Sequence, residues 1–113
     1  MKEIDTQNGK IAFFDEEDLR IADANSFLEL VYSAEADTFA FNRVSFPDSF
    51  FDLKTGFAGE ILQKTSNYKI RLIIVGDFSE YDSKSFQDFV YESNRNGKII
   101  FCDRLETGIA LLK

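Results

Sequence analysis

The stretch FFDLKTGFAGEILQK, residues 50–64, places a hydroxyl and two glycines where a helix is expected to begin. Glycine inside a helix costs up to about 1 kcal/mol relative to alanine, so close packing or a function must compensate at Gly56 and Gly59. A helix N-terminus carries unpaired N–H groups and a partial positive charge, which stabilise an anion. A phosphate on Thr55, beside Lys54, would add about −1.5 to −2 charges to an exposed loop. The pattern makes Thr55 a candidate phosphorylation switch.

A structural explanation accounts for the same small residues. Gly56, Ala58 and Gly59 would leave one side of the helix thin, so that its backbone could lie close to the sheet or to a partner. Thr55, or Asp52 before it, would then only cap the helix. A nucleotide-phosphate site is disfavoured, because neither a Gly-x-Gly-x-x-Gly nor a Walker pattern is present. Under either explanation the candidate docking loop comprises Asp52, Lys54, Thr55, Gly56 and Gly59.

Polar residues at the ends of predicted strands form a second candidate site. Asp77 and Asp103 each close a strand, at the edge where open α/β sheets bind ligands. Together with Asn42 and Arg43 they could line a small polar pocket. Its carboxylates, with Glu60, could act as acid and base or hold a cation such as magnesium. In the alternative interpretation, Asp77 shapes a turn and Asp103 caps a helix.

Several chemistries lack their usual residues. The chain has no histidine, which removes the commonest general base and the commonest metal ligand. Zinc sites need clustered cysteine or histidine. The one cysteine, Cys102, lies in an apolar strand and has no histidine to lower its pKa, so we expect a buried, unreactive thiol. We therefore expect no catalytic residue, no metal and no cofactor.

Charge and hydropathy limit the expected partners and location. The net charge is −7, and all of the excess lies in residues 1–37, which hold 10 acidic and 3 basic side chains. An acidic chain repels phosphate backbones, so we expect no nucleic-acid partner. No stretch approaches the roughly 20 apolar residues of a membrane span, and the first residues lack the apolar run of a signal peptide. With one cysteine and no internal disulfide, we expect a cytoplasmic protein without membrane contact.

Hydrophobic periodicity predicts alternating strands and helices. Residues 3–14 are typical of a hairpin with a type I′ turn at Asn8-Gly9. The run from Ile70 to Phe78 is continuously apolar and β-branched, which indicates a central strand buried on both faces. The order β-β-α-β-α-β-α-β-α predicts one α/β domain over residues 1–113, with a mostly parallel sheet and right-handed crossovers. Beside the hairpin we predict parallel strands at 38–44, 70–76 and 98–102, and helices at 23–35, 52–66, 83–96 and 104–112.

Capping residues predict where three of these helices begin. Asp23 precedes the first helix, and Asp82 or Ser83 precedes the third. Asp103 and Glu106 stand at capping-box spacing before the last helix. These residues should therefore accept hydrogen bonds from the first free backbone N–H groups.

The apolar residues predict a core and an interface. We expect the following side chains to be nearly inaccessible: Leu30, Phe57, Ile61, Ile73, Ile74, Val75, Phe89 and Ile100. Thirteen phenylalanines are many for 113 residues. With helices mainly on one face of the sheet, some rings would stay outside, which favours a homodimer or an obligate partner. The candidate rings are Phe14, Phe39, Phe41, Phe46, Phe50 and Phe51.

Four segments resemble the domain of unknown function 4180 family, a group of small bacterial proteins. They are FFDLKTGFAGEILQK, NYKIRLIIVGDFS, SKSFQDFVYESN and IIFCD. The likeness covers nearly the whole chain. It implies a single-domain bacterial protein and no particular activity.

The element order is also similar to that of the STAS domain, the fold of anti-sigma factor antagonists. In that family a loop of the form Asp-Ser-Ser-Gly precedes a helix, and phosphorylation of its second serine by a partner kinase switches binding off. Anchored on Gly56, Thr55 takes the position of that serine, whereas Leu53 and Lys54 replace the aspartate and the first serine. The likeness implies a sequential strand order and a docking surface on residues 47–59.

Two functions are therefore expected. The leading one is a non-enzymatic regulatory or interaction module of the STAS type, whose partner is another protein, such as a kinase-like regulator. The alternative is a small enzyme or ligand-binding protein that uses Asp77 and Asp103 at the strand ends. An enzyme should show converging carboxylates in a closed pocket, and a docking module should show an accessible Thr55.

Overall fold

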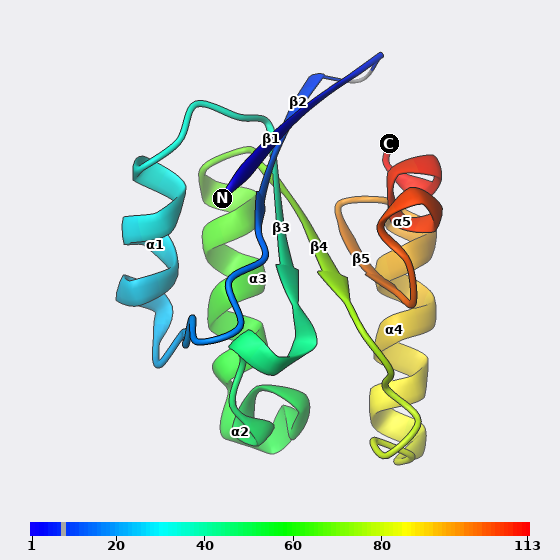
Figure 1. Cartoon of the computed structure of the whole chain (residues 1–113). Helices are drawn as coiled ribbons and strands as arrows, with labels where there is room; N and C mark the ends of the chain where they lie inside the picture. Colours follow the sequence, from blue (N-terminus) through cyan, green and yellow to red (C-terminus); the bar gives the residue numbers. More distant parts are fainter. Residues whose placement is uncertain (8) are drawn as a thin grey trace.

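A five-stranded sheet in the order β1-β2-β3-β4-β5 forms the centre of the molecule (Figure 1). The computed structural model describes residues 1–7 and 9–113. The strands are β1 (Lys2–Thr6), β2 (Gly9–Phe14), β3 (Thr38–Asn42), β4 (Arg71–Val75) and β5 (Ile99–Cys102). β1 pairs antiparallel with β2, and all other pairs are parallel. The predicted hairpin, parallel sheet and sequential order are confirmed, whereas the Asn8-Gly9 turn type involves a residue outside those described.

Helices cover the two faces of the sheet unequally. The longer helices are α1 (Ala24–Tyr32), α3 (Phe57–Asn67) and α4 (Lys84–Asn96), and α5 (Leu105–Leu111) ends the fold. Because right-handed crossovers between sequential strands return on the same side, α1, α3 and α4 share one face. Only α5 packs on the other face, where Gly108 lets it approach the sheet: a Cβ there would lie 2.7 Å from Cys102 Sγ.

The strand β4 is buried on both sides, as its apolar run predicts. Its neighbours are β3 and β5, so it is not an edge. Leu72 and Ile74 join the larger core beneath α1, α3 and α4, whereas Ile73 joins the smaller core beneath α5. Of the predicted core, four side chains are fully buried: Ile61, Ile73, Ile74 and Ile100.

The other four core predictions are wrong in degree, since these side chains are only partly buried. They are Leu30, Phe57, Val75 and Phe89. Each lies at the margin of a packed layer. Val75 ends β4 and Phe57 begins α3, while Phe89 borders an open groove between α3 and α4. A periodic apolar stripe identifies a helix face but not where its packed partner ends.

Two of the three predicted helix caps are confirmed and one is wrong. Asp23 accepts a hydrogen bond from Ser26 N at 2.8 Å, and Ser83 accepts one from Phe86 N at 3.1 Å. The predicted capping box of Asp103 and Glu106 is wrong, because the N-cap of α5 is Arg104, whose side chain makes no capping bond. Arg104 has an extended backbone (φ −142°, ψ 140°) and α5 begins at Leu105, so Asp103 lies one residue too early to cap.

The predicted helix over 52–66 is also wrong at its start. Instead, a short helix α2 (Asp48–Phe51) and a 3₁₀ turn η2 (Leu53–Thr55) precede α3, and a further 3₁₀ turn η1 (Arg43–Ser45) follows β3. The Asp52 side chain accepts a hydrogen bond from Lys54 N at 3.2 Å, which favours the tight turn. Gly56 then has φ +80°, a left-handed conformation that ends the turn and delays α3 to Phe57.

The six candidate phenylalanine rings do not reach the surface. All six candidate rings are at most 5% exposed, and they are Phe14, Phe39, Phe41, Phe46, Phe50 and Phe51. The segment after β3 folds back under α3, so these rings contact one another instead of solvent; Phe46 and Phe50, for example, have centroids 4.5 Å apart. The expectation of exposed rings is wrong, and self-association stays a prediction without that support.

Candidate functional site

The segment 47–59 lies beyond the carboxyl ends of β3 and β4, where Figure 1 shows α2. Phe50 and Phe51, in α2, point into the core and are 2% and 4% exposed. The Phe51 ring stacks on Tyr81 with centroids 4.4 Å apart and meets Phe86 edge-on at 5.9 Å. These three rings form an aromatic platform, which fixes this segment to the connection between β4 and α4.

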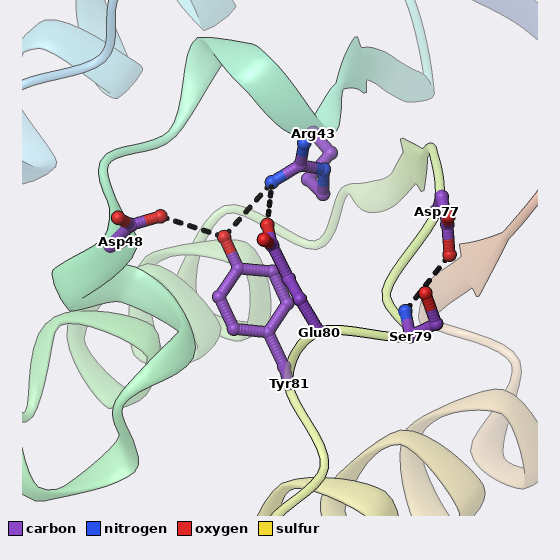
Figure 2. Close-up of polar contacts among 6 residues, drawn as sticks. All are labelled: Arg43, Asp48, Asp77, Ser79, Glu80 and Tyr81. Carbon is purple, nitrogen blue, oxygen red and sulfur yellow. Dashed lines mark hydrogen bonds and ion pairs between the residues drawn. The ribbon is translucent and has the colours of Figure 1, made fainter.

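A polar network holds the same two segments together (Figure 2). Arg43 Nη1 donates to Glu80 Oε1 at 2.7 Å and to the Tyr81 hydroxyl at 2.9 Å. The Tyr81 hydroxyl in turn donates to Asp48 Oδ1, in the first turn of α2, at 2.7 Å. Burial raises the pKa of Tyr81 to about 12, with a further contribution from the Asp48 bond, while Arg43 opposes the shift. The hydroxyl therefore keeps its proton and remains the donor to Asp48.

The Thr55 side chain makes hydrogen bonds to other residues of the segment 47–59. Its Oγ1 lies 2.6 Å from Ser49 O and 2.9 Å from Asp52 O, to which its single hydroxyl proton can be donated. The same oxygen accepts a hydrogen bond from Phe57 N at 3.3 Å. Thr55 nonetheless remains an exposed residue. The hydroxyl of this exposed residue thus joins α2, the 3₁₀ turn and the first residue of α3.

The two glycines beside Thr55 do not serve close packing within the chain. A Cβ at Gly56 or at Gly59 would meet no atom within 4 Å, so neither backbone is pressed against the sheet. The left-handed backbone at Gly56 accounts for that glycine. Gly59, inside α3, has no such conformational reason. What the two positions share is an open surface beside Thr55.

The predicted polar pocket is only partly assembled. Arg43 belongs to the network above, and Asn42 is half-buried at the end of β3. Asp77 Oδ1 accepts from Ser79 N at 2.9 Å, the turn predicted as its alternative role (Figure 2). Hydrogen bonds from Ser79 lower the pKa of Asp77, with a smaller contribution from the Arg43 charge. Asp103 is exposed beyond β5.

Near this edge, the described residues offer neither a reactive thiol nor a cluster of metal ligands. Burial raises the pKa of the Cys102 thiol to about 11, which keeps it protonated. In the part of the chain that the structure describes, no cluster of three or more His, Cys, Asp or Glu side chains could hold a metal ion.

A cavity of about 520 Å³ lies beside Arg43, and its polar lining includes Arg20, Ser45 and Asp48.

Sequence patterns did not single out three members of the network: Asp48, Glu80 and Tyr81. Tyr81 stands in the polar stretch FSEYDS, where an aromatic ring among turn residues is the one available signal. Its partners Arg43 and Asp48 lie 38 and 33 residues away in the chain, so local spacing carries no information about the contacts.

Comparison with known proteins gives a family without an assigned activity. A family model described as a domain of unknown function, DUF4180, matches residues 6–112. Neither a curated protein nor a solved structure matches the chain. Among the described residues, no helix has the length and apolar content needed to cross a membrane.

Proposed function

We propose, for a chain that belongs to the domain-of-unknown-function family DUF4180, a non-enzymatic role as a regulatory protein-interaction module of the STAS type. Its docking surface is the segment 47–59, and its switch is Thr55. The partner is another protein in the cytoplasm of a bacterial host. The observation that carries the proposal is Thr55, an exposed residue whose hydroxyl is bonded to three backbone positions of its own segment.

The chemistry of the switch follows from these bonds. Phosphorylation replaces the Thr55 hydroxyl proton with a dianionic group, so Oγ1 can no longer donate to Ser49 O or Asp52 O. The new charge also repels both carbonyl oxygens and the nearby Asp52 carboxylate. The N–H groups at the start of α3 can donate hydrogen bonds to the phosphate. The segment should therefore rearrange locally, while the aromatic platform of Phe51, Tyr81 and Phe86 keeps the fold intact.

The open surface supplies the docking side of the proposal. Gly56 and Gly59 carry no side chain, and nothing in the described part of the chain covers them. A partner can therefore contact the backbone of the first turn of α3 directly. This accounts for Gly59, which would otherwise cost helix stability without a structural return.

Variants at Gly59 test the docking surface. Affinity capture from the native host, followed by mass spectrometry that maps phosphorylation, identifies the partner. Gly59→Gln adds a long neutral side chain in open space, and Gly59→Ala is the matched control. The proposal requires Gly59→Gln to weaken partner binding by about tenfold or more, or about 1.4 kcal/mol, while Gly59→Ala binds nearly as the parent does. Equal binding by all three folded proteins contradicts it.

Ligand binding at the strand ends is the second candidate, and one observation favours it. Arg43 and Ser45 line the cavity of about 520 Å³, and the buried Ser45 hydroxyl has no hydrogen-bond partner among the described residues. Isothermal titration with sodium phosphate tests this role. Phosphate binding that is lost in Arg43→Gln supports a ligand site, and absence of phosphate binding removes this candidate.

A further inference from the structure

A second concave site lies at the opposite end of the sheet from the segment 47–59. It is a groove of about 820 Å³ between α3 and α4, at the amino ends of β4 and β5, which we call the α3–α4 groove. Here α3 packs along α1, whereas the backbones of α3 and α4 come close at few positions. Figure 1 shows α3 and α4 on the same side of the sheet, with the starts of β4 and β5 at the end away from α2.

The floor and the walls of the groove are largely apolar. Ile70, just before β4, and Ile99, the first residue of β5, belong to the larger core and line the groove at the sheet. Leu62 of α3 and Phe89 of α4 line it at the helices, and Leu62 is 39% exposed. The Phe89 ring meets Phe101 edge-on with centroids 5.8 Å apart, so packing against β5 holds this wall in place.

Two cations at the border of the groove face away from it. Arg71 has the strand phase of Ile73, and Lys98 has that of Ile100, so both side chains point to the α5 face of the sheet. Lys98 Nζ donates a 2.9 Å hydrogen bond to the main-chain oxygen of Lys113, which follows α5. Arg71 and Lys98 therefore supply no charge to the groove.

The other charged residues of the groove cancel each other. Lys69 and Glu92 are opposite in sign, and both are exposed, so water solvates and screens their charges. Among the described residues of the lining, no other side chain carries a charge. A charged ligand group inside the groove would therefore lose its hydration without gaining a counter-ion, which favours an uncharged ligand.

One buried hydroxyl in the groove lacks a partner. Ser93 lines the groove one helical turn after Phe89 and is 7% exposed. The buried Thr65 hydroxyl on α3 donates to Ile61 O at 2.8 Å, whereas the Ser93 hydroxyl has no hydrogen-bond partner among the described residues. Buried polar groups are nearly always hydrogen-bonded, and a hydroxyl both donates and accepts. A ligand hydroxyl or carbonyl inside the groove would supply the missing partner.

We propose that the α3–α4 groove binds a small, soluble, uncharged molecule that has an apolar body and one hydroxyl or carbonyl group. The polar group bonds to the Ser93 hydroxyl, and the apolar body lies against Leu62 and Phe89. The volume of the groove lies within the range of about 300–1,000 Å³ that small-molecule sites occupy, and apolar walls with few polar groups are typical of them. The site is separate from the segment 47–59, so it stands or falls independently of the docking function.

Three probes with the same octyl tail test the charge of the ligand. Titration of the full chain with 1-octanol, followed by nuclear magnetic resonance, should shift the backbone amide signals of Leu62, Phe89 and Ser93. Sodium octanoate and octylammonium chloride should bind at least about tenfold more weakly, because their heads would lose hydration beside Ser93. Equal binding of the three probes, no binding of 1-octanol, or shifts confined to other parts of the chain overturns the proposal.

Variants locate the polar group of the ligand. Ser93→Ala should weaken 1-octanol binding by about fivefold, which corresponds to one neutral hydrogen bond. Ser85→Ala, which removes an exposed serine of α4 outside the groove, is the matched control and should bind as the parent does. Ser66→Phe fills the groove from its exposed edge and should weaken binding by about tenfold or more.

Two results would contradict this assignment. One is 1-octanol affinity that is unchanged in both Ser93→Ala and Ser66→Phe, with circular dichroism showing that the variants are folded. The other is a dimer of the parent in sedimentation that does not bind 1-octanol and that Ser66→Phe dissociates. That result would assign the groove to a second copy of the chain instead of a small molecule.

Discussion

The two ends of the space between α3 and α4 differ in how they are filled. At the carboxyl ends of the strands, Phe51, Tyr81 and Phe86 pack together and the polar network of Arg43 locks them in place. At the amino ends, the same two helices leave a groove of about 820 Å³. The comparison shows that the same helix pair carries a closely packed aromatic platform of Phe51, Tyr81 and Phe86 at one end and leaves an open groove at the other.

The largest expected contrast between the two ends is in stability. Phe51→Ala should lower the free energy of unfolding by about 3–5 kcal/mol, because the ring is 4% exposed and contacts several aromatic side chains. Leu62→Ala, at the groove, should cost about 0.5 kcal/mol, because Leu62 is 39% exposed. Urea unfolding measures both. Equal losses would mean that the groove is as firmly packed as the platform.

Substitutions at the two glycines of the proposed docking surface should change stability in opposite directions. Gly56→Ala should destabilise the protein by about 1–2 kcal/mol, because its φ of +80° is strained for an L side chain. Gly59→Ala should stabilise it by up to about 1 kcal/mol, because the position is helical and open. Thermal unfolding of the pair distinguishes them. A stabilising Gly56→Ala would show that the left-handed turn is not required.

The tyrosine network should give the platform a dependence on alkaline pH. The folded-state pKa of Tyr81 is raised to about 12, above the unfolded value of about 10, so its contribution to stability is complete below pH 10. That contribution is lost as the pH rises from about 10 to about 12. Tyr81→Phe should cost about 1 kcal/mol at neutral pH and remove this part of the alkaline loss.

The exposed Tyr91, 64% accessible, provides the control for that measurement. Urea unfolding as a function of pH should show the same alkaline loss in Tyr91→Phe as in the parent. Ultraviolet titration of tyrosinate should lose a late-ionising group in Tyr81→Phe and not in Tyr91→Phe. The pKa of Tyr32 is also raised, by its hydrogen bond to Tyr68, so that group should ionise late in both variants. If Tyr81→Phe lost as much stability at alkaline pH as the parent, the hydroxyl network would not contribute to the stability of the platform.

The smallest contrast concerns the helix starts at the strand ends. Ser83→Ala should cost about 1 kcal/mol, because Ser83 accepts a 3.1 Å hydrogen bond from Phe86 N at the start of α4. Asp103→Ala should change stability by no more than about 0.5 kcal/mol, because Arg104 occupies the cap of α5. Chemical unfolding of both tests the corrected cap. A loss at Asp103 as large as that at Ser83 would restore its capping role.

The fold could be predicted from local patterns because those patterns act over short distances. The apolar run at β4 predicts its burial on both faces of the sheet. Asp23 and Ser83 mark helix starts because each accepts a hydrogen bond from the backbone N–H three residues later. The segment 47–56 could not be predicted in this way. Its path depends on the tight turn capped by Asp52, on the φ of Gly56 and on Phe51 reaching Tyr81.

The candidate site shows the same division. Thr55 and its glycines were found because the residue types lie within five positions of one another. The Arg43–Tyr81–Asp48 contacts join residues more than 30 positions apart, and the α3–α4 groove arises from how far apart two helices lie on the sheet. Neither leaves a periodic trace in one sequence, because both are set by tertiary packing.

The affinity of the captured partner for Thr55 variants tests the central claim most directly. Thr55→Glu removes the hydroxyl donor and adds a negative charge, whereas Thr55→Ser keeps the hydroxyl that bonds Ser49 O and Asp52 O. The account predicts that isothermal titration shows binding weakened by about tenfold or more, or about 1.4 kcal/mol, in Thr55→Glu and nearly unchanged in Thr55→Ser. Equal affinities of both variants and the parent, with all three folded, would contradict the regulation of this surface through Thr55.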